Sequence, residues 1–422
     1  MPTLSSTGVH QPKPLTDNPR SVPAHVPVDR IVDFDVHNPA NIADGYHEAW
    51  KILQKPGVPD LVWTPRNGGH WIATRGALIA DFLNDPEHFS ARVMIVPKEA
   101  GMQHKLIPMN MDPPEHTPYR HVLNKGLGPR EIKKIESSIR EVAAQLIDEF
   151  AASGRVEFCA AYSRIFPIKV FLAFSGLPLQ DAALLTNFAS NMLRPEGTTP
   201  EQMAESLAAA NKGFFSYIGP TVADRRAHPK DDWISTIIHS QVNGRPLSDY
   251  EILAMISLVL LAGLDTVVNF LPFCMEFLAR NPSDVEELRS DPARLPRRVE
   301  ELFRRFPMVA QARLVTKDVM RDGVEMKQGE MVLVPSTLHG IDERENPNPM
   351  RLDFTRKTGT HSTFGAGAHV CAGMHLARME VIVTFQEWFA RIPRFRLQQN
   401  FRMVAHSGVV ATFDALNLEW DV

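Results

Sequence analysis

Hydrophobic residues recur at three- and four-residue steps along much of the chain from Pro129 to Asn281. The clearest case is REIKKIESSIREVAAQLIDEFAASG, residues 130–154, in which one face of a helix would be apolar. The apolar positions are Ile132, Ile135, Ile139, Val142, Leu146 and Ile147. This spacing predicts a single amphipathic helix, ended by Gly154, within an α-rich body.

The stretches before and after this body carry both strand and helix signals. Within residues 33–90, TPRNGG followed by HWIATRG places Asn-Gly-Gly beside aromatic and β-branched residues, which predicts a β-hairpin. Beyond Pro282, the pairs DG at 322–323 and QG at 328–329 divide short strand-like runs. RRVEELFRRF and MHLARMEVIVTFQEWFARI have helical spacing. The predicted fold is mainly α with a small β region.

Composition and charge narrow the class of protein. The chain has 422 residues, of which 44% are hydrophobic and 22% are charged, as in an ordinary globular protein. Its formal net charge of -4 gives no electrostatic footprint for nucleic acid. Residues 1–30 are rich in proline and polar residues, which predicts a flexible arm. No long low-complexity linker follows, so residues 31–422 are expected to form a single domain.

Cysteine usage and hydropathy indicate the compartment. Cys159, Cys274 and Cys371 are far apart, which argues against a disulfide framework and a CxxC zinc site. The longest mainly apolar run, ILAMISLVLLAGL from Ile252, is too short to span a bilayer. The N-terminus lacks the basic start and apolar core of a signal peptide. A soluble cytoplasmic protein is expected, without a membrane or nucleic-acid partner.

One cysteine lies in a glycine-rich segment, FGAGAHVCAG at residues 364–373. Cys371 could be an inert buried thiol, a nucleophile with His369 or His375 as its base, a redox sensor or a metal ligand. The glycines favour a sharp turn or the close approach of a flat group, and the helix that follows would stabilise a thiolate. Both histidines are poorly spaced to activate the thiol. A metal ligand would require cations and an oxygen-handling site elsewhere in the chain.

Three motifs, in this order along the chain, resemble those of the cytochrome P450 superfamily. Residues 261–269, LAGLDTVVN, resemble its oxygen-activation helix, with an acid–alcohol pair at Asp265 and Thr266. EELFRR supplies the E-x-x-R pair as Glu301 and Arg304. The F-x-x-G-x-x-x-C-x-G signature is formed by Phe364, Gly367, Cys371 and Gly373.

The resemblance extends to the bacterial camphor hydroxylase family, from about Asp33 to the C-terminus. Similar stretches include MDPPEH, GIDERENP and HLARMEVIVTFQEW. The resemblance implies a triangular, mostly helical class I enzyme that encloses haem b between two helices. It also implies O2, a small hydrophobic substrate, and electrons from NADH through a ferredoxin reductase and a [2Fe-2S] ferredoxin. A soluble monomer in the bacterial cytoplasm is expected.

The same resemblance assigns roles to individual residues. Cys371 would be the proximal haem ligand, Glu301 and Arg304 would be structural, Thr266 would support dioxygen and a water, and Asp265 would gate protons. The other haem-binding positions would be Arg120, Arg313, Phe364, Gly367, His369 and Gly373, with the two arginines and the histidine at the propionates. The acid–alcohol pair interrupts an apolar helical segment, which predicts a functional kink. The alternative is a Thr266 hydroxyl that only bonds back to its own helix.

The residues expected to hold substrate differ from those of the camphor enzymes. The predicted pocket comprises Ile95, His104, Met109, Leu258, Leu261, Ala262, Val309 and Val410. His104 stands where the camphor enzyme has a tyrosine that donates to the ketone, and a histidine can still donate. An apolar, methionine-lined pocket favours a terpenoid or norisoprenoid ketone such as an ionone. Camphor is the alternative substrate, and a non-catalytic haem–thiolate sensor is a remote alternative because it would lack the acid–alcohol pair.

The surface over Cys371, where a ferredoxin would dock, also departs from the camphor enzyme. Basic positions there read Ala80, Glu87, Thr117 and Thr358 in this chain, and Arg120 is the chief cation retained. Because complementary charge mainly sets association rate and partner choice, a different cognate ferredoxin is expected.

Overall fold

Helices make up the larger part of the molecule. The computed structural model describes residues 21–102, 106–193, 196–197, 199–357, 359–402 and 404–422. Its α-helices are α1 (Tyr46–Lys51), α2 (Gly76–Asn84), α3 (Lys98–Gly101), α4 (His116–Leu127), α5 (Pro129–Lys134), α6 (Glu136–Asp148), α7 (Phe166–Phe174), α8 (Ala182–Leu193), α9 (Pro200–Ala227), α10 (Trp233–Ile238), α11 (Asp249–Leu264), α12 (Val267–Arg280), α13 (Pro282–Arg289), α14 (Leu295–Arg305), α15 (Ser336–Gly340) and α16 (Met374–Arg391). The expected α-rich body is therefore present, and β4 (Arg155–Glu157), β5 (Gln241–Val242) and β6 (Arg245–Pro246) interrupt it.

The single helix predicted over residues 130–154 is wrong, because the chain forms two helices there. Ile135 leaves the helical conformation, with φ -99° and ψ 3°, between α5 and α6. Ile132 packs in one hydrophobic cluster and Ile139 in another, so the two helices bury their apolar faces against different parts of the core. Gly154 adopts a left-handed φ of 70°, but only after α6 has ended and a 3-10 turn has followed.

The strands before and after the helical body form the predicted small β region. They are β1 (Leu61–Thr64), β2 (His70–Ala73), β3 (Phe89–Ser90), β7 (Ala310–Val315), β8 (Val319–Arg321), β9 (Val324–Met326), β10 (Met331–Pro335), β11 (Arg396–Leu397), β12 (Ala405–His406), β13 (Thr412–Phe413) and β14 (Asn417–Glu419). The main sheet has the order β1-β2-β10-β7-β3. The predicted hairpin is confirmed: Trp63 pairs with Trp71 across antiparallel β1 and β2, and Asn67 turns the chain with φ 50°.

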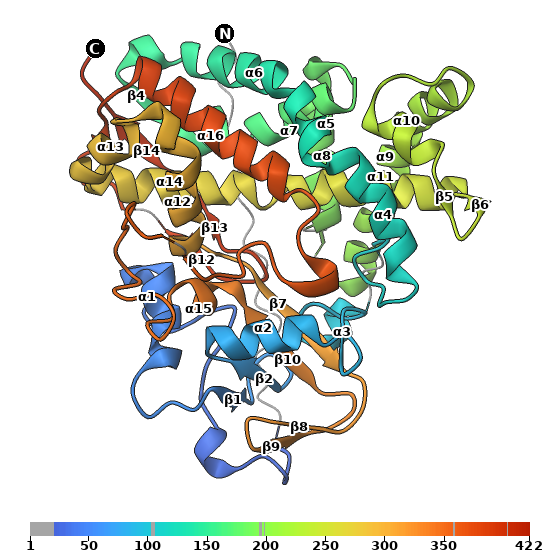
Figure 1. Cartoon of the computed structure of the whole chain (residues 1–422), viewed down its shortest axis with the longest axis vertical. Coiled ribbons are helices and arrows are strands. Elements are labelled where there is room, and N and C mark those ends of the chain that lie inside the picture. The colour runs from blue at the N-terminus through green and yellow to red at the C-terminus, as the bar shows by residue number, and fades with distance from the viewer. Residues whose placement is uncertain (1–20, 103–105, 194–195, 198, 358, 403) are drawn as a thin grey trace.

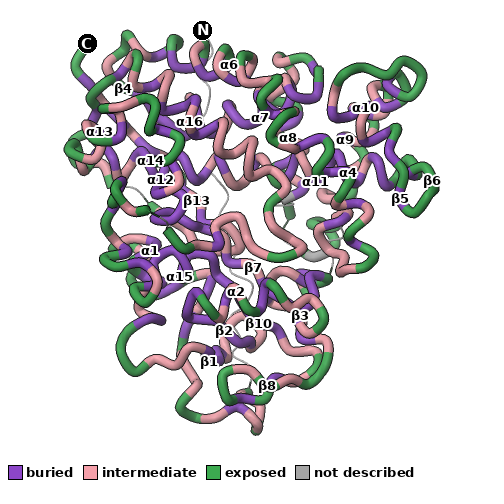
Figure 2. The backbone as a smooth tube through the Cα atoms, viewed as in Figure 1, coloured by how far each residue is buried: buried purple, intermediate pink, exposed green. Residues whose placement is uncertain are grey.

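Helices α11 and α12 lie nearly end to end across the middle of the molecule (Figure 1). Together Asp249–Arg280 is long and apolar enough to cross a membrane, but 67% of its most apolar window is buried inside the protein. Figure 2 shows that α11 and α12 are largely buried, whereas the tip of the β5–β6 hairpin is exposed. Its apolar composition is therefore that of a core helix. The apolar segment is longer than the run from Ile252 that the sequence indicated was too short to span a bilayer.

Part of the predicted N-terminal arm contacts the body of the protein. Val26 is buried, and Arg30 donates to the Leu61 carbonyl oxygen at 3.1 Å and pairs with Asp322. These contacts begin before the boundary expected at residue 30, and residues 1–20 lie outside the described part of the chain.

Candidate active site

The Cys371 segment forms a tight loop between the sheet and α16. The Cys371 amide donates to the Phe364 carbonyl oxygen at 2.7 Å and closes the loop. Gly367 has φ 63°, and a Cβ there would lie 2.6 Å from the Leu83 carbonyl oxygen at the end of α2. The glycine at 367 is therefore required by a left-handed turn and by close packing of the loop on α2. Of the two interpretations of the glycines, the sharp turn applies at this position.

Cys371 is an exposed residue, but many protein atoms surround its sulfur. Of the cysteines in the described residues, Cys159 and Cys274 are buried and Cys371 is exposed. Burial among protein atoms is still the largest influence on Cys371 and raises its pKa. The Gly373 N–H, Arg120 and Arg378 act in the opposite direction. A backbone N–H and two cations therefore surround a sulfur that could carry negative charge as a ligand.

Buried donors without acceptors converge beside this loop. Arg313 on β7 is 2% exposed, and its Nη1 donates to Gln311 Oε1 at 3.0 Å and to the Ala312 carbonyl oxygen at 2.8 Å. Its Nη2 has no hydrogen-bond partner within the described ranges. The buried Nε2 of His369 is likewise without a partner there, and the His369 ring lies 4.3 Å from that of His116.

The electrostatics of these groups favour an anionic partner. Burial lowers the pKa of Arg313 to about 10 and that of His369 to about 3, and nearby cations add to the second shift. Arg120 lies one helical turn after His116 on α4, and burial lowers its pKa while Cys371 opposes the change. Buried donors cost free energy unless they find acceptors. Two propionates would supply those acceptors, so the residues present fit haem b.

Sequence reasoning did not identify His116 as part of this cluster. The spacing H-x-x-x-R places His116 and Arg120 on one face of α4, and this signal could have found it.

The long apolar helix breaks at the acid–alcohol pair. Asp265 and Thr266 separate α11 from α12, which confirms the predicted kink. The break falls where the two hydrophobic clusters meet, because α11 packs in one and α12 in the other. Thr266 Oγ1 donates to the Ala262 carbonyl oxygen at 2.9 Å, so the back-bond considered from the sequence is present. Asn269 Nδ2 donates to the Asp265 carbonyl oxygen at 2.9 Å and helps to fix the break, a role the sequence did not predict.

Five of the eight predicted pocket residues fall into two groups. Leu258 and Leu261 lie in the last two turns of α11, before the break at Asp265 and Thr266. Both belong to one hydrophobic cluster, and Met109 packs against that cluster. Val309 and Val410 pair in an isolated antiparallel bridge. Ala262 is exposed, and Ile95 follows Met94, whose carbonyl oxygen accepts from the Ala312 amide at 2.7 Å. His104 lies outside the described residues.

Glu301 and Arg304 form the buried charge network expected of them. Arg304 is fully buried and donates Nε and Nη2 to the two Glu301 carboxylate oxygens at 2.8 and 2.7 Å. It also donates to the carbonyl oxygens of Gly340, Pro349 and Arg351 at 2.8, 2.7 and 3.0 Å. The pair thus ties α14 to the loop that precedes the Cys371 segment.

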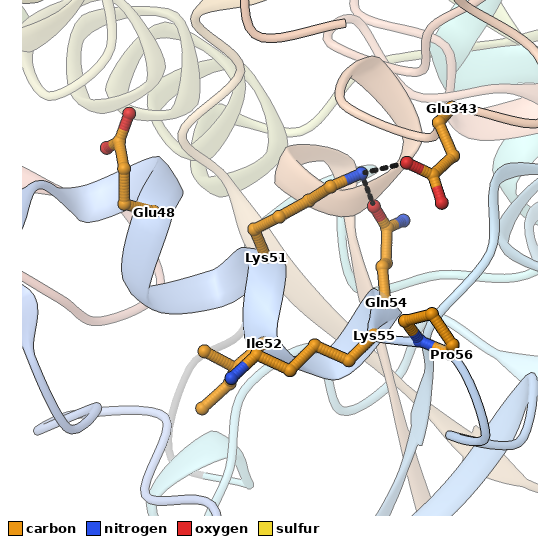
Figure 3. Close-up of a pocket in the computed structure, with 7 residues that line it drawn as sticks. All are labelled: Glu48, Lys51, Ile52, Gln54, Lys55, Pro56 and Glu343. Carbon is orange, nitrogen blue, oxygen red and sulfur yellow. Dashed lines mark hydrogen bonds and ion pairs between the residues drawn. The ribbon is translucent and has the colours of Figure 1, made fainter.

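A hollow of about 210 Å³ near α1 lies apart from this chemistry (Figure 3). Lys51 lines it and donates to the Ile341 carbonyl oxygen and to Gln54 Oε1 at 2.9 and 3.1 Å, with Glu343 3.7 Å away. Lys51 is therefore already engaged by neighbouring groups, and the Cys371 loop remains the candidate active site.

Comparisons with known proteins agree with this geometry. The family model described as Cytochrome P450 matches residues 183–399. A probable cytochrome P450 127A1 of Sinorhizobium fredii is 32% identical over 417 residues, covering 97% of this chain and 98% of the relative. The crystal structure of CYP101J2 is 38% identical with a TM-score of 0.88, covering 96% of this chain and 100% of that one. The crystal structure of cytochrome P450 CYP101C1 is 35% identical with a TM-score of 0.87, covering 95% of this chain and 100% of that one. The chain therefore belongs to the cytochrome P450 family, as a haem b monooxygenase of the CYP101 type.

Proposed function

We propose that this enzyme inserts one oxygen atom of O2 into a C–H bond of a terpenoid or norisoprenoid ketone of about the size of an ionone. The observation that carries the proposal is the apolar end of α11, where Leu258 and Leu261 join a hydrophobic cluster and Ala262, which is exposed, lies one helical turn before Thr266. Val309 and Val410, which pair in an isolated bridge, would add a second apolar wall. Burial of apolar surface would hold a hydrocarbon ring system in such a pocket.

Cys371 would ligate the haem iron, and Arg120, Arg313, His369 and His116 would bind the propionates. Haem b bound in this way supplies the activation of dioxygen. Because the Thr266 hydroxyl proton is committed to the Ala262 carbonyl oxygen, the hydroxyl oxygen is left to accept a hydrogen bond and hold a water.

Asp265 lies beside Thr266 at the break and would deliver protons from solvent to that water. Asn269, with its Nδ2 also 3.4 Å from Asp265 Oδ1, would orient the carboxylate for proton transfer.

We predict that the enzyme binds ketones more tightly than the matching hydrocarbons, and that His104→Phe reduces this difference. A donor left without an acceptor in an apolar pocket costs roughly 1 to 3 kcal/mol, which is about a 5- to 150-fold change in Kd. The measurement is a titration of each ligand by the haem spin-state shift. Met109→Leu is the control, because it alters shape without removing a donor. Equal weakening of ketone and hydrocarbon by His104→Phe would contradict the assignment.

We also propose that electrons come from NADH through a ferredoxin reductase and a [2Fe-2S] ferredoxin that differs from the camphor enzyme's own. Glu87, on the predicted docking surface, pairs with Lys317 at 2.5 Å and neutralises its charge. The surface around Glu87 therefore offers little positive charge to attract an acidic ferredoxin. A hollow of about 530 Å³ lies along α4, lined by Pro118, His121, Val122, Asn124, Lys125 and Gln241. Thr358 lies outside the described residues. A monomeric, cytoplasmic enzyme with one domain over residues 31–422 is part of this proposal.

The camphor enzyme's ferredoxin should support turnover several-fold more slowly than the cognate one, and Glu87→Arg and Thr117→Arg should raise its rate at low salt. Added cations strengthen attraction to an acidic ferredoxin, and salt screens it. NADH-driven turnover across a salt series checks this, with Glu205→Arg on α9 as a charge-matched control. Full-rate turnover with the foreign ferredoxin, unchanged by the added arginines, would refute the idea that this face sets partner choice.

A further inference from the structure

The aromatic ring that opens the Cys371 loop is packed against a cation. The guanidinium carbon of Arg378 lies 4.5 Å from the centroid of the Phe364 ring, within the range of a cation–π interaction. The Phe303 ring packs on Phe364 with centroids 4.8 Å apart. Since the Phe364 carbonyl oxygen accepts the Cys371 amide, the position of this ring and the position of the sulfur are linked.

Arg378 is itself held in place by a carboxylate from another helix. Its Nε and Nη2 donate to the two oxygens of Glu300 at 2.6 and 2.9 Å, which joins α16 to α14. The side chains are 27% and 40% exposed, so solvent screens the pair only in part. Glu300 is adjacent to the buried Glu301, yet it takes no part in the network of Arg304.

We propose that the Arg378–Glu300 pair sets the reduction potential of the haem, with Arg378 as a positioning residue that orients Phe364 and places positive charge near the sulfur. The proposal rests on Cys371 as the haem ligand. Reduction of ferric to ferrous haem adds one negative charge, so a nearby cation favours the reduced state and a nearby anion opposes it. Arg378 therefore raises the potential and Glu300 moderates the increase.

This arrangement predicts shifts of opposite sign for the two partners. Arg378→Met removes the cation and leaves the Glu300 carboxylate, so the potential should fall. Glu300→Gln leaves the cation without its counterion, so the potential should rise. Each shift should change the ratio of ferrous to ferric haem at a fixed applied potential by roughly threefold to tenfold. A pair that only stabilises the loop would shift both variants in the same direction.

The test is spectroelectrochemical titration of the substrate-free holoenzyme. Arg391→Met is the matched control, because Arg391 is also on α16 and also binds a carboxylate, Asp148, at 2.5 and 3.3 Å. The ferrous–CO band of the wild-type protein establishes thiolate ligation first, so failure of the ligand assignment is distinguished from failure of this inference.

Opposite shifts in Arg378→Met and Glu300→Gln, with an unchanged potential in Arg391→Met, support the proposal. Shifts of the same sign, or no shift, in proteins that keep the ferrous–CO band overturn it. If Arg378→Met does not retain haem, the Glu300→Gln variant decides alone: a rise supports the proposal, and a fall or no change overturns it.

Discussion

Replacing Thr266 with alanine is expected to leave NADH consumption running while most of the electrons are released as hydrogen peroxide. The Thr266 hydroxyl is fixed by its bond to the Ala262 carbonyl oxygen, and alanine has no oxygen with which to hold the water. Without that water, proton delivery to dioxygen loses its last step. The measurement is the ratio of hydroxylated product to NADH in a reconstituted system, which we expect to fall about tenfold or more. Thr266→Ser keeps the hydroxyl and should retain most of the coupling.

Asp265→Asn should behave differently, because it removes the proposed proton carrier and leaves the Thr266 hydroxyl, the proposed water site, intact. We expect turnover itself to slow by about 100-fold, with less peroxide than in the alanine variant. Tight coupling in Thr266→Ala, or an Asp265→Asn variant as fast as the wild type, would refute the roles assigned to this break.

Arg304→Met is expected to destabilise the folded protein by about 3 to 5 kcal/mol and to reduce haem retention. The substitution leaves the Glu301 carboxylate buried without its bidentate partner and removes the arginine donor from three carbonyl oxygens. Arg356, 3.3 Å from Glu301, offers only partial compensation. The midpoint of urea unfolding and the haem absorbance measure the effect.

Arg297→Met is the control on the same helix, because Arg297 is exposed and makes one long hydrogen bond, of 3.4 Å, to a backbone carbonyl oxygen. We expect it to change stability by less than about 0.5 kcal/mol. An Arg304 variant as stable as this control would show that the buried network does not support the haem-side loop.

Short motifs located a tight loop and a helix break more sharply than periodicity located the ends of the helices. Cys371, Asp265 and Thr266 carry signals within a few residues, and the structure places them in a tight loop and at a helix break. The break at Ile135 could not be read from the same kind of pattern, because the apolar spacing continues through it. The position of the break depends on which hydrophobic cluster α5 and α6 each pack against, and that packing is a property of the whole fold.

Contacts between distant segments were also beyond the sequence. His116 joins the cluster at His369 because α4 packs against the loop, and Gly367 is required by the end of α2. The Arg378–Glu300 pair connects residues 78 positions apart. Each contact depends on tertiary packing. The H-x-x-x-R spacing indicates that His116 and Arg120 share a face of α4, but it does not indicate that His116 contacts His369.

The most direct test of the account is the ferrous–CO spectrum of the wild-type protein beside Cys371→His, with Cys274→Ala as a control for a buried cysteine away from the loop. Thiolate ligation by Cys371 predicts that the wild type and Cys274→Ala show the absorption band that gives the family its name. It also predicts that Cys371→His loses this band while remaining folded. A band that survives in Cys371→His would contradict the assignment of the haem ligand, and with it the active site described above.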